Sequence, residues 1–182
     1  MGTNTVAVIA KDLSNNKRTN NYQVVVTNNT VAKTLRYDAN GNLFSGAGRT
    51  VTYDFENRPV SITKGGVTST FVYDGDGGRV TKTVGGLTTT YIGKLYECEN
   101  GFCVKYIFAG TQRIAMKQVS SGSVSYYHPD HLGSTSVLTT ASGTQEQALT
   151  YYPFGGTRTN TGPANVPYKY TGKELDETDL YF

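Results

Sequence analysis

The residue types with the most specific chemistry lie in one stretch, 126–143. It holds the only two histidines of the chain, His128 and His131, with Asp130 between them and Ser134 three residues further on. Two imidazoles and a carboxylate could ligate a metal ion. A serine beside a histidine and an acid could act in nucleophilic catalysis.

Neither chemistry is favoured by the spacing. Two histidines three residues apart on a loop or strand seldom converge on an ion without a scaffold, and no third strong ligand is evident. The segment Leu132-Gly133-Ser134 is not the Gly-x-Ser-x-Gly nucleophile elbow. We therefore predict no catalytic residue and no metal site here. In the structural interpretation, Pro129 starts a turn, Asp130 caps it and the histidines bond neighbouring backbone.

Two further acidic groups are candidates for chemistry. Asp74-Gly75-Asp76-Gly77 has part of a calcium-loop pattern, but Gly85 occupies the twelfth position, where such a loop needs glutamate. A turn explains it better. Glu174, Asp176 and Glu177 could do acid-base work, yet no neighbouring pattern predicts a pocket or a raised pKa, so we expect them in a turn and on the surface. We predict no cofactor.

The two cysteines lie on either side of Glu99-Asn100-Gly101-Phe102. Asn-Gly accepts positive φ at both central positions of a type I′ turn, which predicts a two-residue hairpin. Cys98 and Cys103 then become a non-hydrogen-bonded pair with Cα atoms about 4.5 Å apart, a distance that a disulfide accepts. Two reduced cysteines or half of a zinc site remain alternatives. A disulfide would indicate an oxidising, extracytoplasmic setting.

The elements that must position these groups are short strands. From Leu35 onward an aromatic-Asp unit recurs, with its tyrosines 16 and 20 residues apart, which allows two strands and two turns per unit. In each unit the aromatic ends a strand, Asp accepts backbone N–H groups, and Asn or Gly takes the left-handed position. The repeat residues are Tyr37, Asp38, Gly41, Tyr53, Asp54, Tyr73, Asp74 and Gly77.

These units resemble YD repeats, and three later motifs resemble the repeat-associated core region of the Rhs family. The motifs are His128-x-Asp130-His131-Leu132-Gly133-Ser134, Tyr151-Tyr152-Pro153-Phe154-Gly155 and Thr171-Gly172-Lys173-Glu174-Leu175-Asp176-Glu177. The family usually has glycine where this chain has Asp179. In the family a self-cleavage motif and then a variable toxin follow, and this sequence contains neither. The resemblance implies a sheet that spirals into a hollow shell around a cargo.

Composition agrees with an all-β chain. The 182 residues include 21 glycines, 14 tyrosines and no tryptophan, with only five prolines, as expected for many strands joined by tight turns. We predict antiparallel hairpins in a curved or spiral sheet of some ten to twelve strands. The predicted divisions are 1–29, two strands around a polar turn at 12–21 that resemble the end of an immunoglobulin-like module; 30–125, the repeat strip; and 126–182, the core region.

Charge and hydropathy exclude some partners. The chain has 17 lysines and arginines against 14 aspartates and glutamates, a net charge of +3. The cations are scattered along the sequence, which argues against a nucleic-acid partner. No apolar run is long enough to span a bilayer, and the N-terminus lacks a signal-peptide pattern. The expected partners are other parts of a larger Rhs polypeptide, further copies of this chain or a toxin cargo.

Three functional classes follow from the sequence. The first is a non-enzymatic structural segment of a secreted or cell-surface Rhs-type toxin. The second is a self-associating extracellular protein that forms oligomers or filaments by strand addition between copies. The third is a carbohydrate-binding adhesin that uses surface tyrosines.

Overall fold

The computed structural model describes residues 2–11, 17–26 and 34–182, with backbone only for the first two ranges. The chain divides into two units, Met1–Thr34 and Leu35–Phe182. In the first, β1 (Gly2–Lys11) and β2 (Lys17–Val26) pair antiparallel from Gly2 with Val26 to Lys11 with Lys17. Residues 12–16 of the predicted polar turn lie outside the described residues.

The second unit is one antiparallel sheet of 14 strands that pair strictly in chain order from β3 to β16. The strands are β3 (Arg36–Tyr37), β4 (Leu43–Gly46), β5 (Arg49–Tyr53), β6 (Pro59–Lys64), β7 (Val67–Tyr73), β8 (Arg79–Val84), β9 (Leu87–Ile92), β10 (Tyr96–Glu99), β11 (Phe102–Ala109), β12 (Gln112–Gln118), β13 (Val124–Pro129), β14 (Thr135–Thr140), β15 (Gln145–Tyr151) and β16 (Thr157–Thr161). The predicted antiparallel all-β class is confirmed. The sheet runs without interruption across 125/126, where β12 pairs with β13.

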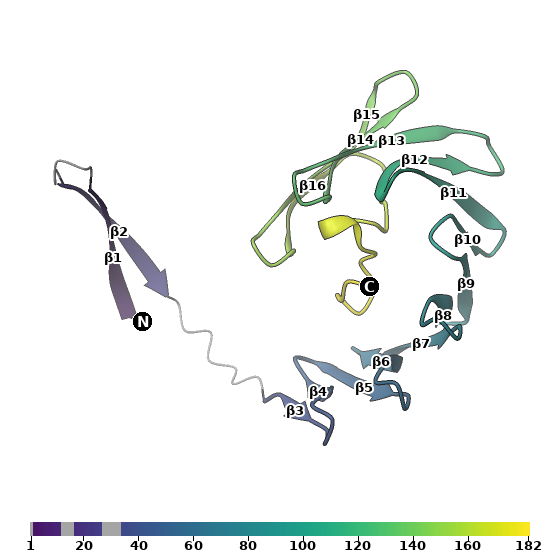
Figure 1. Ribbon diagram of the computed structural model, residues 1–182, viewed down its shortest axis with the longest axis horizontal. Helices are drawn as coiled ribbons and strands as arrows, with labels where there is room; N and C mark the ends of the chain where they lie inside the picture. Colours follow the sequence, from purple (N-terminus) through teal and green to yellow (C-terminus); the bar gives the residue numbers. More distant parts are fainter. Residues whose placement is uncertain (1, 12–16, 27–33) are drawn as a thin grey trace. The chain divides into compact units, whose positions relative to one another are not determined.

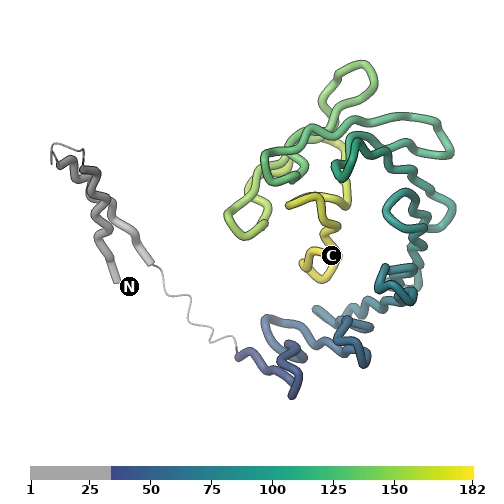
Figure 2. The backbone as a smooth tube through the Cα atoms, in the orientation of Figure 1, coloured from purple at the N-terminus to yellow at the C-terminus, as the bar shows by residue number. Residues whose placement is uncertain are grey.

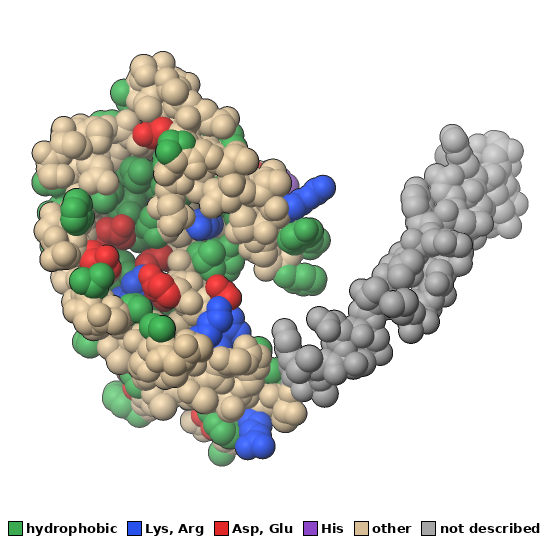
Figure 3. All heavy atoms as spheres, turned by 180° about the vertical axis from the view of Figure 1, so that it is seen from behind, with side chains coloured by type: hydrophobic (Ala, Val, Ile, Leu, Met, Phe, Trp, Pro, Cys, Tyr) green, Lys and Arg blue, Asp and Glu red, His purple; other side chains and the backbone are tan. Residues whose placement is uncertain are grey.

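This sheet curves around a hollow, and residues 162–182 turn back along its inner side (Figures 1 and 2). The segment includes one short 3₁₀ turn, Tyr170–Gly172. In the view from behind, acidic and basic side chains gather in the hollow with apolar ones around them (Figure 3). Among the described residues, no helix has the length and apolarity needed to cross a membrane.

Two kinds of turn recur along the chain. Tight turns place both central residues at positive φ, as at Gly65-Gly66, Gly85-Gly86 and Asn100-Gly101. The other kind spans five residues, and its first residue exchanges backbone hydrogen bonds with the fourth and fifth. This second turn starts at eight described positions: Asp38, Asp54, Asp74, Asp130, Thr140, Tyr152, Lys169 and Asp176.

Strand alternation builds a core on the inner face only. In β7, Ser69 and Phe71 are buried while Thr68, Thr70 and Val72 are exposed. One apolar cluster consists of Val51, Ile62 and Phe71, with Leu180 and Phe182 packed on it. A second consists of Tyr127, Leu138, Leu149 and Val166. The 162–182 segment therefore supplies the second layer that the sheet needs.

The strand number differs from the prediction. The sheet has 14 strands, where the sequence predicted ten to twelve in all. The clearest omission is β16, Thr-Arg-Thr-Asn-Thr, in which every residue is exposed. Such a strand has no buried face and so no apolar alternation by which to recognise it. It forms by pairing with β15, from Ala148 with Thr161 to Tyr151 with Thr157.

Candidate functional site: the lined inner face

The repeat aspartates cap their own turns. Asp38 Oδ1 accepts the N–H groups of Asn40 at 2.9 Å and Asn42 at 2.8 Å. Asp54 and Asp74 accept the same two amides of their turns at 2.7–3.0 Å. The hydrogen bond from Asn42 is the main reason that the pKa of Asp38 is lowered. The fourth residue of each turn has positive φ: Gly41, Asn57 and Gly77.

The repeat tyrosines connect successive turns. Tyr53 donates its hydroxyl to the carbonyl of Leu43 at 2.9 Å, and Tyr73 donates to that of Pro59 at 2.7 Å. In both pairs the acceptor is the first residue of the strand that follows the preceding turn. Tyr151 donates in the same way to Thr135 at 2.8 Å. Tyr37, by contrast, is 55% exposed.

The histidine stretch contains another copy of the repeat turn. Asp130 Oδ1 accepts the N–H groups of Leu132 and Ser134, both at 2.8 Å. Burial opposes ionisation of Asp130, but these hydrogen bonds outweigh it and lower its pKa. Gly133 takes the left-handed position at φ 82°. The sequence motif that looked most like chemistry is therefore a turn built like those at Asp38, Asp54 and Asp74.

The histidines differ from the prediction in their partners. His128 bonds a side chain, through Nε2 and Thr139 Oγ1 at 2.9 Å, and not neighbouring backbone. The reason is register, since β14 runs beside β13 and places Thr139 close to His128. His131 lies on the exposed turn. Within residues 34–182 and the described N-terminal strands, no group of three or more His, Cys, Asp or Glu side chains is arranged to hold a metal ion.

The three core-region motifs meet in space. Ser134 is fully buried, and its Oγ accepts the N–H of Thr171 at 3.1 Å. Thr135 donates its N–H to the carbonyl of Lys169 at 3.0 Å. Tyr170 donates its hydroxyl to Pro153 at 2.8 Å. The turn that begins at Asp130 thus holds the 168–173 segment, which in turn contacts the 151–155 motif.

The acidic residues near the C-terminus correct the sequence interpretation. Glu174 and Asp176 are buried, with side chains 5% and 0% exposed, while Glu177 is 55% exposed. Lys82 donates to Glu174 Oε1 at 2.8 Å and Asp176 Oδ1 at 3.1 Å. Arg79 donates to Asp176 Oδ2 at 3.0 Å and also pairs with Glu174. Only Glu177 is the surface residue that was predicted for all three.

Arg79 of this cluster also lies on aromatic rings. The Arg79 guanidinium carbon is 4.8 Å from the ring centroid of Tyr91 and 4.9 Å from that of Phe182. Tyr91 donates its hydroxyl to Glu174 at 2.9 Å. Burial and the nearby Glu174 charge raise the pKa of Tyr91 above its usual value. Every charge of the buried cluster therefore has a partner of opposite charge.

A second polar cluster surrounds Arg113. Its guanidinium stacks 3.3 Å from the ring centroid of Tyr168 and 4.8 Å from that of Tyr106. Both tyrosines donate hydroxyls to Glu97. Burial raises the pKa of Glu97, although these hydrogen bonds and Arg113 oppose the shift. Local sequence gave no signal for this cluster, because its members come from four separate segments.

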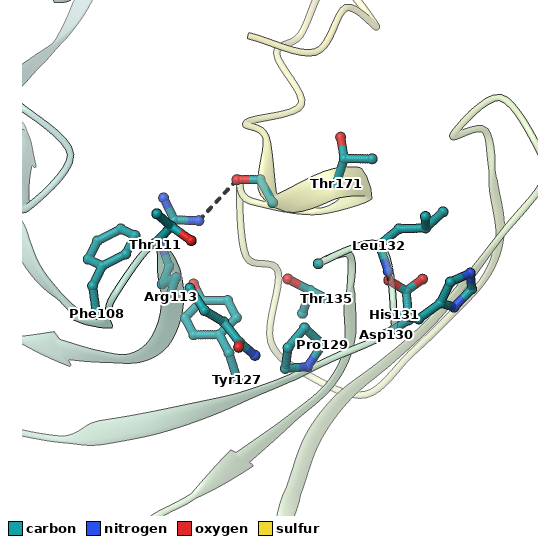
Figure 4. Close-up of a pocket in the computed structure, with 13 residues that line it drawn as sticks. Phe108, Thr111, Arg113, Tyr127, Pro129, Asp130, His131, Leu132, Thr135 and Thr171 are labelled. Carbon is teal, nitrogen blue, oxygen red and sulfur yellow. Dashed lines mark hydrogen bonds between the residues drawn. The ribbon is translucent and has the colours of Figure 1, made fainter.

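A hollow of about 450 Å³ lies beside Arg113 (Figure 4). Its walls include Phe108, Tyr127, His131 and Thr171, and Arg113 Nη1 crosses it to donate to the Gly172 carbonyl at 3.2 Å. A second hollow, of about 520 Å³, lies between Arg79, Lys94 and Phe182. In the second hollow Arg79 and Tyr91 already bond Glu174.

The cysteines form the predicted disulfide. Cys98 and Cys103 are bonded, with Cα atoms 4.1 Å apart. They face each other across β10 and β11, and Glu99 with Phe102 closes the turn. Asn100 and Gly101 both have positive φ, at 48° and 82°. The bond lies near the end of this hairpin, next to Glu97 of the Arg113 cluster.

No protein-family model matches this sequence, and no curated protein matches it. Solved structures do match. The crystal structure of TcdB2-TccC3 has 20% identity and a TM-score of 0.66 over 80% of this chain and 9% of the matched chain. A Photorhabdus luminescens Tc holotoxin pore has 18% identity and a TM-score of 0.69 over 99% and 11%, and TcdB2-TccC3-Cdc42 has 17% and 0.67 over 98% and 11%. This chain thus has the fold of a small part of much longer toxin-complex chains.

Proposed function

We propose that this chain is a non-enzymatic structural segment of a longer, secreted or cell-surface Rhs-type toxin polypeptide, and that its sheet is part of the wall of a shell around a cargo. The observation that carries the proposal is the arrangement of β3–β16. They pair in chain order in one curved sheet, and the buried side chains lie on its inner face. Within residues 35–182, both edge strands have an unpaired side, so further strands can extend the wall in either direction.

The fold comparisons support this proposal because the matched chains are much longer than this one. The chain spans only 9–11% of the toxin-complex chains that it matches, as expected for one part of a larger wall. The repeat units and the three core-region motifs add the resemblance to the Rhs family. The disulfide supports an extracytoplasmic location.

The side-chain contacts support a structural role over an enzymatic one. Asp130 and Ser134 are engaged in turn and segment hydrogen bonds. Glu174 and Asp176 are engaged in ion pairs with Arg79 and Lys82. A general acid or base needs access to a substrate proton, and these groups are committed to partners within the fold.

One observation favours a second function, self-association through an open edge. All five residues of β16 are exposed, and an exposed edge strand can pair with a strand of another copy. The two functions differ in the state of the isolated chain. A wall segment is expected to remain monomeric, whereas strand addition gives oligomers or filaments whose mass grows with concentration.

The test is the mass of the intact chain by light scattering over a range of concentrations, with electron microscopy of the same samples. A constant monomer mass supports the wall segment. Oligomers that disappear in T157K/T161K, which charges the β16 edge, and persist in T70K/T90K overturn it in favour of strand addition. The control pair adds the same charge to exposed sites on interior strands β7 and β9.

A further inference from the structure

Residues 174–182 form a small hairpin, here called the latch, on the inner face of the sheet. Glu174 and Phe182 exchange backbone hydrogen bonds at 2.9 and 3.1 Å. The five-residue turn from Asp176 to Leu180 closes the hairpin, with Asp179 at positive φ. The latch is thus one more copy of the repeat turn, folded inward and not added to the sheet.

The latch is hydrogen-bonded to Arg49 through Thr178, to Gly155 through Tyr181 and to Pro167 through Leu175, and two adjacent sets of contacts join it to β5–β8. Leu180 and Phe182 pack on the Val51, Ile62 and Phe71 cluster, and the Phe71 and Phe182 ring centroids are 5.2 Å apart. Beside this apolar half, Glu174 and Asp176 pair with Arg79 and Lys82 of β8. Within residues 34–182, no backbone-to-backbone hydrogen bond joins the latch to β5–β9, so side chains hold the latch against these strands.

The charged half is buried and balanced. Side-chain exposure is 11% for Arg79, 8% for Lys82, 5% for Glu174 and 0% for Asp176. Two cations face two carboxylates, which is the condition under which buried charges are tolerated. If both carboxylates become neutral, two cations remain close together with little water to screen them. The geometry therefore couples docking of the latch to ionisation of this pair.

We propose that the latch is an acid-sensitive device, which detaches from the inner face as a unit when Glu174 and Asp176 are both protonated, while β3–β16 stay paired. Detachment uncovers the Val51, Ile62 and Phe71 cluster and the two cations of β8. This property of the inner face goes beyond the wall function and does not require it.

The pKa directions assign the acid response to Glu174 and not to Asp176. Burial raises the pKa of Asp176 to about 6, although Arg79 and Lys82 oppose the shift. Burial acts the same way on Glu174, but Arg79, Lys82 and the Tyr91 hydrogen bond outweigh it and lower its pKa. Asp176 therefore takes the first proton, which favours the docked state. Ionised Glu174 keeps the latch docked until the pH falls below the ordinary carboxylate pKa of about 4.

Other titratable groups face the cluster. Tyr91 of β9 bonds Glu174, and its raised pKa keeps it neutral in acid. Glu177 reaches Lys82 at 3.4 Å from the exposed side. At the rim, Asp179 pairs with Lys64 and lies 4.0 Å from Arg49. Glu177 and Asp179 attract these cations from exposed positions, where screening makes the attraction weak.

The test is a pH titration of the intact chain by methyl NMR. Leu180 and Ile62 report the latch, and Leu138, in the other apolar cluster, reports the rest of the sheet. Between about pH 5, where Asp176 is already protonated, and about pH 3 we expect the open population of the latch to rise on the order of tenfold or more, with Leu138 unchanged. No change at Leu180, or Leu138 moving together with Leu180, overturns the proposal.

Variants separate the buried charges from acidity in general. E174Q/D176N is expected to be open at pH 7, since it removes both buried carboxylates that face the two cations. R79M/K82M/E174Q/D176N replaces all four charges and is expected to stay docked at both extremes of pH. E177Q, at the exposed carboxylate, is expected to titrate like the unmodified chain. A latch that stays docked at pH 7 in E174Q/D176N, or that opens at pH 7 in E177Q as well, contradicts the mechanism.

Discussion

At the scale of single residues, close packing decides which positions need glycine. Gly155 has φ 83°, and a Cβ there would lie 2.7 Å from the Tyr170 ring and 3.1 Å from that of Tyr181. Tyr181 also donates its hydroxyl to the Gly155 carbonyl at 2.8 Å. Gly143 has a nearly identical φ, 85°, but a Cβ there would meet nothing within 4 Å. The two positions share a backbone requirement and differ only in the space around it.

Alanine at these two glycines separates strain from packing. G143A is expected to lower the free energy of unfolding by about 1 kcal/mol, the cost of a left-handed alanine. G155A is expected to lower it by roughly 2 kcal/mol more, because the tyrosine rings must move. Urea denaturation followed by circular dichroism measures both. Equal losses in the two variants would show that the tyrosine rings move away without cost.

At the scale of elements, the hairpin is the unit, and its turn chemistry is local. Asp38, Asp54, Asp74 and Asp130 each bond amides two and four residues ahead. The β10–β11 hairpin adds a covalent bond between residues only five apart. A loop this short loses little entropy on closure, so the disulfide constrains one hairpin and not the sheet.

Removal of the disulfide is therefore expected to be tolerated. C98S/C103S should lower the free energy of unfolding by about 2 kcal/mol or less, with the β-type circular dichroism spectrum retained. Reduction of the unmodified chain is the matched measurement and should give a similar loss. Collapse of the spectrum after reduction would mean that the whole sheet depends on this bond.

At the scale of the whole unit 35–182, a single sheet is stabilised by what lies on its inner face. Residues 162–182 reach from Gln147 of β15, which accepts the Val166 N–H at 3.2 Å, to Arg49 of β5, which donates to the Thr178 carbonyl at 2.7 Å. Buried and half-buried tyrosines fill the space between. Burial is the main cause of the raised pKa of each of these: Tyr91, Tyr106, Tyr127, Tyr151 and Tyr168.

Because the pKa values of these tyrosines are raised, we expect the protein to lose stability in alkali. Their folded-state pKa values are raised, so above about pH 10 the unfolded chain releases protons that the folded chain retains. Stability is thus unaffected by them below pH 10 and falls as the pH rises further. Tyrosinate absorbance and circular dichroism should change together in one cooperative step above pH 10. Gradual ionisation of all tyrosines near pH 10, with the fold intact, would contradict the burial of their hydroxyls.

The amino-acid sequence by itself determined the strands with an alternating pattern, the aspartate turns and the disulfide register, but not β16. Each rests on contacts within a few residues: alternation along a strand, Asp130 bonding Leu132 and Ser134, and Asn-Gly between the cysteines. Only the tertiary structure decided that residues 162–182 line the inner face of the sheet. Lys82 and Glu174 are 92 residues apart, and a carboxylate with a distant cation looks in sequence like any surface acid. Burial of a charge depends on a partner that only the curvature of the sheet brings near.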